Sequence, residues 1–461
     1  MRGSRTKQVV LALGYTLAVA ALAAPAPAGA VEVPWEVSEH HLQNGIKVLL
    51  LEDHRAPVVV FQVWYRVGSR HERQGMTGMS HLLEHMMFKG TRRFGAKVFS
   101  NLIQRNGGSH NAFTSRDYTA YFERMASDRV ELAMELEADR MMNLVLDPKE
   151  LELERQVVLE ERRTRTEDNP LGALYEEVHA TAFRLHPYRN PIIGWPADLR
   201  AITVESMRRF YRRYYHPAHA TIVAVGDFKT PQMLSLIRKH FGLLQPDPAP
   251  SPPRVQEPPP RGERRVELVR EARLPALMLA YRVPNYRSPS AYALDVLAEV
   301  LAGGESSRLV QRLVYREGIA LGVDADNDLL AHDPSLFTLT ARISRRGTPE
   351  RVEKAIEEEL ARIAREGVGA EELSRTKRRM EAELVFAMDS HFYRAMLLGR
   401  ADAAGDWRLI QSYLRRIAAV TSEDVRRAAA RHLRRENRTV GILRPAPPRA
   451  ARAEKKRGGH P

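Results

Sequence analysis

The stretch Ser80-His81-Leu82-Leu83-Glu84-His85-Met86-Met87-Phe88 places two histidines and a glutamate inside a short apolar segment. His81 and His85 are four residues apart, so on a helix their side chains project from one face about one turn apart. The apolar residues around them predict a mostly buried helix, and buried polar groups need partners. Two surface histidines on an amphipathic helix are the alternative. The pattern favours a buried pair of imidazoles with a carboxylate beside them.

Two imidazoles at this spacing can bind one zinc ion, and manganese or cobalt are the alternative ions. Glu84 stands three residues after His81 and next to the expected ion. From there it can accept a proton from a metal-held water molecule without being a ligand itself. This order of residues is the inverted zincin pattern, H-x-x-E-H. The chain has no cysteine, which excludes thiolate ligands and a cysteine nucleophile.

A third ligand is predicted on a helix from Pro148 to about Thr166, which begins with an N-cap aspartate and a proline. One stripe of this helix, at i, i+3, i+4 and i+7, contains Glu154, Val157, Val158 and Glu161. We expect the valines to turn the stripe toward the core. Two carboxylates on a buried stripe need an electrostatic reason.

From this stripe we predict Glu161 as the third metal ligand. Glu154 is predicted to orient a ligand histidine from outside the metal's own coordination sphere. Glu160 lies about 100° away from the stripe and is not chosen. For Glu154 an ordinary salt bridge to an arginine is the alternative.

The motif with Glu161 placed 76 positions after His85 resembles the pitrilysin or insulinase family of zinc peptidases, which includes the mitochondrial processing peptidases. Three stretches carry the same resemblance: His85-Met86-Met87-Phe88-Lys89-Gly90-Thr91, Gly107-Gly108-Ser109-His110-Asn111-Ala112-Phe113-Thr114, and Glu154-Arg155-Gln156-Val157-Val158-Leu159-Glu160-Glu161. The resemblance implies two homologous domains that face each other across a cavity. It also implies one zinc ion per chain on His81, His85 and Glu161, with Glu84 activating water to hydrolyse peptides or short unfolded polypeptides.

A predicted hairpin over residues 111–122 follows the glycine pair Gly107-Gly108, which ends a helix. At a sheet edge such a strand offers unpaired N–H and C=O groups that can bind an extended peptide. The family resemblance places the substrate backbone along Asn111, Ala112 and Phe113. A purely structural hairpin is the alternative.

The chain repeats one pattern in two halves. Thr203 opens an amphipathic helix followed by a strand over 220–225, and Thr421 opens a helix followed by a strand over 439–443. Apolar strands end similarly at Tyr65-Arg66-Val67 and Tyr281-Arg282-Val283. We infer an internal duplication and predict an α+β fold. Each of two homologous domains is expected to have one mixed, mainly antiparallel sheet with helices on one face.

The N-terminus predicts export. A positive start and an apolar stretch precede Ala28-Gly29-Ala30, a typical cleavage site, which indicates delivery to a bacterial periplasm. An uncleaved membrane anchor is the alternative, and no later apolar run approaches ~20 residues. The predicted segments are a signal peptide (1–30), a zinc-binding catalytic domain (31–245), a proline-rich linker (246–263), a C-terminal domain without metal (264–445) and a basic disordered tail (446–461).

The net charge of +14 is concentrated partly in the two termini, and no zinc-finger or RNA-binding signature accompanies it. We therefore expect no nucleic-acid partner. Binding of an acidic membrane surface or of nucleic acid through the basic tail is the alternative.

The second half departs from the family pattern. Leu297-Ala298-Glu299 aligns with the motif, but the histidines are missing, so this half is not expected to bind zinc. The family often places an Arg and a Tyr there to hold the substrate carbonyl, and Val314 and Leu321 align with them. A homologous partner chain is therefore expected to supply the pair, as in a heterodimer. The alternatives are a non-catalytic assembly subunit on the same fold and substitution by a nearby side chain, namely Arg312, Tyr315 or Arg316.

Overall fold

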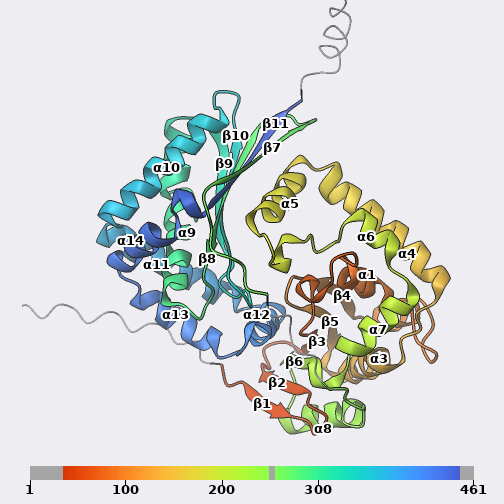
Figure 1. Ribbon diagram of the computed structural model, residues 1–461. Coiled ribbons are helices and arrows are strands. Elements are labelled where there is room, and N and C mark those ends of the chain that lie inside the picture. Colours follow the sequence, from red (N-terminus) through yellow and green to blue (C-terminus); the bar gives the residue numbers. More distant parts are fainter. Residues whose placement is uncertain (1–34, 249–254, 447–461) are drawn as a thin grey trace, which may run out of the picture.

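The computed structural model describes residues 35–248 and 255–446, and within them the chain forms two sheets (Figure 1). The predicted signal peptide, the middle of the linker and all but one residue of the tail lie outside these ranges. The first sheet contains β1 (Ser38–His41), β2 (Lys47–Glu52), β3 (Val58–Tyr65), β4 (Ser109–Thr114), β5 (Thr119–Ala126) and β6 (Ala220–Gly226). The second contains β7 (Arg264–Arg270), β8 (Ala276–Val283), β9 (Ala320–Asn327), β10 (Ser335–Ile343) and β11 (Arg438–Pro445).

The two sheets share one topology. Their strand orders are β1-β2-β6-β3-β5-β4 and β7-β11-β8-β10-β9. In each sheet one pair is parallel, β2 with β6 and β7 with β11, and the remaining neighbours are antiparallel. The first sheet differs by the added strand β1. This correspondence confirms the predicted duplication and the mixed, mainly antiparallel α+β fold, and it makes β4 and β9 equivalent edge strands.

Helices follow the strands in each half. The first half contains α1 (Met79–Met86), α2 (Val98–Arg105), α3 (Val130–Asn143), α4 (Pro148–Arg162), α5 (Pro170–Ala182), α6 (Pro196–Ala201), α7 (Val204–Tyr214) and α8 (Thr230–Phe241). The second contains α9 (Pro289–Ala302), α10 (Pro349–Glu366), α11 (Ala370–Ala387), α12 (His391–Ala404), α13 (Leu409–Ala419) and α14 (Ser422–His432). Among the described helices, none has both the length and the apolar character needed to cross a membrane.

The helix starts follow local sequence signals. The Asp147 side chain accepts N–H bonds from Lys149 and Glu150 at the start of α4. Thr203 and Thr421 each form a capping box at the starts of α7 and α14. These local bonds fix the first turns of α4, α7 and α14 because they satisfy N–H groups that lack partners within the helix.

In each half, one helix packs against the sheet of the other half. The apolar core on one face of the first sheet is built with α1, α3 and α7, while α12 from the second half covers the opposite face (Figure 1). Correspondingly, α5 from the first half packs against β11, β7 and β8 of the second sheet. Two glycines permit the close contact: a Cβ at Gly399 would lie 2.0 Å from the Trp64 ring, and one at Gly441 would lie 2.2 Å from Val178. The halves are therefore interlocked beyond their covalent link.

The linker is anchored where the structure describes it. The Glu257 carboxylate accepts backbone N–H bonds from Arg184, Leu185 and His186 at 2.7, 2.8 and 2.9 Å. It also forms an ion pair with Arg282 at 3.2 Å. One linker side chain thus binds both halves, so residues 255–260 do more than span the distance between the halves.

Candidate metal centre

Helices α1 and α4 pack together and bring three possible ligands to one point. One ligand atom from each of His81, His85 and Glu161 lies within 4.8 Å of the other two. The Glu161 Oε2 atom is 3.7 Å from His81 Nε2 and 3.4 Å from His85 Nε2. Ligand atoms about 2.1 Å from a tetrahedral ion stand about 3.4 Å apart. The donor set and its spacing therefore fit a zinc ion.

Glu154 lies where the sequence predicts an orienting carboxylate. Its Oε2 atom is 3.0 Å from His85 Nδ1, so the other ring nitrogen of His85 faces Glu161. The Lys89 ammonium pairs with the second oxygen of Glu154 and lies 3.4 Å from Glu150. Such a contact on the far side of a ligand histidine fixes its tautomer and ring orientation.

The surroundings of the two histidines shift their pKa values in opposite directions. Burial, with the neighbouring His85, lowers the pKa of His81 to about 4, so His81 is a neutral imidazole with a free lone pair. Burial also acts against protonation of His85, but hydrogen bonds to Glu154 and Glu161 overcome it and raise its pKa to about 9. Hydrogen bonding from His85 lowers the pKa of Glu161. The carboxylates thus favour a positive charge at this point, which a metal cation can supply in place of the proton.

Glu84 stands beside the three ligand atoms without joining them. Burial raises its pKa, and a hydrogen bond from the Thr114 hydroxyl to its Oε2 atom, at 2.5 Å, acts in the opposite direction. Thr114 is the last residue of β4, so this bond fixes the carboxylate against the edge strand. The arrangement gives a carboxylate that can take up a proton next to the candidate metal position.

One part of the sequence argument for α4 is wrong. Val158 is buried, but Val157 is 49% exposed, so only part of the expected stripe faces the core. Glu154 and Glu161 turn inward because their carboxylates meet the histidines and Lys89, not because valines flank them. Glu160 is exposed and pairs with Arg163 at 2.6 Å, away from the histidines.

A cavity of about 680 Å³ opens over these residues. Asn111, Ala112 and Phe113 of the edge strand β4 line it together with His81, Glu84, His85 and Glu161. The remaining lining residues also come from the first half: Thr114, Arg116, Arg165, Thr166, Gly172, Tyr175, Glu176, His179, Arg189, Asn190, Pro191, Ile192 and Ile193. Within the described ranges, the second half contributes no residue to this wall.

Three supporting residues were not found from the sequence. Thr114 belongs to the N-A-F-T stretch and holds Glu84, and Lys89 holds Glu154. Glu72 accepts backbone N–H bonds from Gly78 and Ser80, at 2.8 and 2.7 Å, and so caps the start of α1. Thr114 and Lys89 are polar residues inside quoted motif stretches, which is a usable signal. Glu72 binds N–H groups that lie six and eight residues later in the chain, and no motif around it signals this role.

The second-half positions lie away from this cavity. Leu321, on the edge strand β9, is exposed, and Val314 packs beside the second core. Arg312 is engaged with Glu317 and Glu358 at 2.7 and 2.5 Å. Tyr315 is exposed and, like Arg316, is not part of the cavity wall.

Comparison with protein families matches both halves. Residues 47–195 match the family described as insulinase (peptidase family M16), and residues 201–380 match the peptidase M16 inactive domain. The zinc protease PqqE of Helicobacter pylori is 31% identical over 408 residues, covering 88% of this chain and 92% of that protein. An uncharacterised zinc protease of Mycobacterium tuberculosis is 33% identical over 389 residues, covering 83% of this chain and 87% of that one.

A solved structure agrees with these matches. The crystal structure of a protease from Helicobacter pylori superposes with a TM-score of 0.86 at 30% sequence identity. The match covers 89% of this chain and the whole of that chain. The likeness therefore extends over both sheets and the helices between them.

Proposed function

The chain belongs to the insulinase family, peptidase family M16, and on that premise we propose that it is a zinc-dependent metallopeptidase acting on peptides or short unfolded polypeptides. The observation that carries the proposal is the meeting of His81, His85 and Glu161 at one point, with Glu84 beside them in a cavity. The names of the zinc protease relatives support the choice of metal. We propose one zinc ion per chain.

Each residue then has a role. His81, His85 and Glu161 hold the metal, and Glu154 keeps the His85 ring oriented through its Nδ1 atom. Bound zinc supplies Lewis-acid activation of a water nucleophile and of the substrate carbonyl. Glu84 accepts the proton of the attacking water and returns it to the departing amide nitrogen. The Thr114 hydroxyl holds the Glu84 carboxylate in position for both transfers.

The substrate binds along β4 in this proposal. β4 is the outermost strand of the first sheet, and it lines the same cavity as Glu84. Asn111, Ala112 and Phe113 offer backbone groups that an extended peptide can pair with as an added strand. This placement sets the peptide backbone beside the candidate metal position.

The decisive variant is Glu84→Gln. It keeps the size of the side chain and the metal ligands but removes the proton acceptor, so peptide hydrolysis should fall by several orders of magnitude while zinc content is unchanged. Cleavage of a quenched-fluorescence peptide library and metal analysis of the same preparation measure the two effects. Glu160→Gln, which changes an exposed glutamate on α4, is the matched control. Normal turnover by Glu84→Gln would reject the mechanism, and zinc binding without any hydrolysis by the unaltered chain would favour a non-catalytic assembly subunit.

We also propose export to the periplasm, on the basis of the sequence of residues 1–30. Cell fractionation with N-terminal sequencing tests it. The expected result is a periplasmic protein that begins at Val31, and a membrane-bound chain that retains Met1 would indicate an uncleaved anchor.

A further inference from the structure

The cavity beside Glu84 contains an arginine that lacks a carboxylate partner. Arg116 lines the cavity from the turn between β4 and β5. Across the ranges the structure describes, no carboxylate oxygen lies within 4.0 Å of its guanidinium. Its Nε atom is buried without an acceptor. Its Nη1 and Nη2 atoms each reach the Tyr175 hydroxyl at 3.4 Å, which is long for an N–H···O bond.

The neighbouring carboxylates are already paired elsewhere. Asp328 forms an ion pair with Arg400 at 2.7 Å. Glu176, which lines the same cavity as Arg116, accepts two bonds from Arg162 at 2.7 and 2.8 Å. A partly buried guanidinium that has no ion-pair partner and only long hydrogen bonds is costly, because it has given up water for weak acceptors.

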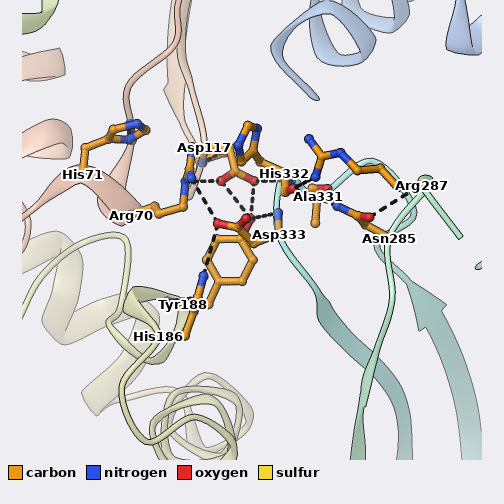
Figure 2. A network of polar contacts seen from close by, with 12 residues as sticks. Arg70, His71, Asp117, His186, Tyr188, Asn285, Arg287, Ala331, His332 and Asp333 are labelled. Carbon is orange, nitrogen blue, oxygen red and sulfur yellow. Dashed lines mark hydrogen bonds and ion pairs between the residues drawn. The ribbon is translucent and has the colours of Figure 1, made fainter. Parts of the chain in front are cut away.

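The turn that carries Arg116 is held firmly. Figure 2 shows the next residue, Asp117, at the centre of a buried polar network that joins the two halves. The Asp117 carboxylate pairs with Arg70 at 2.9 Å and accepts bonds from the Tyr188 hydroxyl and the His332 N–H. The backbone that carries Arg116 is therefore held in place before any ligand binds, which reduces the part of the entropy cost of binding that comes from ordering the turn.

We propose that Arg116 binds a carboxylate of the substrate, so that the cavity selects peptides with an Asp or Glu side chain, or a free C-terminus, near the scissile bond. The inference rests on the proposed peptidase function. A guanidinium binds a carboxylate through two parallel N–H···O bonds, and this pair would give the Nε atom an acceptor. The Tyr175 ring, 46% exposed and 5.8 Å from the guanidinium carbon, forms the adjacent wall and offers its hydroxyl to the same carboxylate.

The alternative is a structural role. The Arg116 guanidinium also lies 6.0 Å from the Tyr188 ring, and its backbone carbonyl accepts the Arg70 N–H at 2.9 Å. A residue needed only for packing would change stability when replaced, but it would not change which peptides are chosen. Peptide choice therefore separates the two roles.

The test uses paired quenched-fluorescence peptides with the full chain. Members of a pair differ only by Glu or Gln at one position flanking the cleaved bond, or by a free or amidated C-terminus, which distinguishes the two sources of carboxylate. We expect kcat/KM to favour one acidic member by about tenfold or more. In Arg116→Gln that ratio should approach one, and in Arg116→Lys it should be reduced. Arg105→Gln, on the exposed side of α2 outside the cavity, should keep the full ratio.

A binding measurement separates this inference from the proposed function. In the Glu84→Gln background, fluorescence anisotropy compares the acidic and neutral peptides with and without Arg116→Gln. A chain that cleaves no peptide but binds the acidic member more tightly through Arg116 would contradict the proposed function alone. An unaltered chain that treats all pairs equally overturns the inference. A folded Arg116→Gln variant that retains the full preference also overturns the inference. If Arg116→Gln does not fold, an Arg116→Lys variant that retains the full preference overturns it instead.

Discussion

Glu161 and Glu160 are neighbours in sequence with opposite surroundings. Glu161 is drawn inward by two histidines and pairs with Arg165 at 2.9 Å on its other oxygen. Glu160 faces solvent and pairs only with Arg163. A solvent-exposed ion pair of that kind contributes little to the stability of the fold. The difference between these residues makes them a matched test of the metal site.

We predict that Glu161→Ala removes most of the bound zinc, whereas Glu160→Ala retains it. The reason is that two imidazoles alone leave a zinc site one protein ligand short. Metal analysis after gel filtration, together with zinc titration of the apo chain, measures the loss. Full stoichiometric zinc in Glu161→Ala, with loss in Glu160→Ala, would show that the ligand was chosen wrongly.

At this scale the sequence predicted which residues meet and that Glu154 supports a histidine, but it missed the supporting residues Thr114, Lys89 and Glu72. His81, His85 and Glu84 share one helix, so their spacing carries the information. Glu161 lies on a second helix, and the argument about buried charge placed it beside the histidines although Val157 is exposed. The Arg116 side chain gave no signal, because its lack of a counter-charge depends on where distant carboxylates lie.

Equivalent helices of the two halves differ where the first half has its candidate metal site. Glu299 on α9 stands where α1 carries Glu84, and valines stand at the histidine positions. On α11, which packs against α9 as α4 packs against α1, Arg379 forms an ion pair with Glu299 and lies 3.5 Å from Glu383. In the second half an arginine therefore supplies the positive charge that this glutamate needs.

The exchange of α5 and α12 could not be predicted from the sequence. Both helices carry apolar residues, but a helix pattern does not show which sheet the helix covers, and here the contact depends on close approach at Gly399 and Gly441. Capped helices and paired strands, in contrast, follow local patterns, and these were predicted correctly for α4, α7 and α14.

The loop from Ala331 to Pro334 joins the second half to the network in Figure 2. Its Asp333 carboxylate is 3.0 Å from Arg70 Nη1 and 3.2 Å from His186 Nε2. Burial disfavours the charged form of Asp333, but the His186 hydrogen bond and the Arg70 charge prevail and lower its pKa to about 2. An unfolded chain would give this carboxyl a pKa of about 3.9.

We predict a stabilising contribution from Asp333 that depends on pH. Since its pKa is lower in the folded chain, the contribution is complete above about pH 4 and is lost as the pH falls toward 2. The difference in Tm between the unaltered chain and Asp333→Asn should therefore be largest near pH 6 and shrink below pH 4. Asp128→Asn, at an exposed aspartate, is the control and should change Tm little at any pH. A difference that stays constant from pH 6 to pH 3 would contradict the assignment.

On the scale of the whole molecule, the cavity beside Glu84 is lined, within residues 35–248 and 255–446, by residues of the first half alone. The first half provides the three candidate ligand atoms, the proposed proton acceptor Glu84 and an edge strand. A peptidase also needs donors for the negative charge that develops on the substrate carbonyl oxygen. Val314 and Leu321, aligned with the family's Arg and Tyr, have no side-chain donor, and neither of them lines the cavity.

We therefore predict that a homologous chain completes the site. Alone, the chain should cleave peptides slowly, and adding a co-encoded homologue that carries the Arg and Tyr pair should raise kcat/KM by about 10² or more, the usual effect of a lost electrophilic donor. The assay compares peptides of several lengths with each chain alone and with the mixture, and analytical ultracentrifugation tests whether the two chains associate.

In a mixture made with Glu84→Gln the gain in kcat/KM should disappear, because the proposed proton acceptor belongs to this chain. Arg165 lines the cavity and pairs with Glu161 at 2.9 Å, which makes it a candidate donor within this chain. Full activity of the isolated chain, unchanged by the homologue and lost in Arg165→Gln, would assign the donor role to Arg165 and remove the need for a partner.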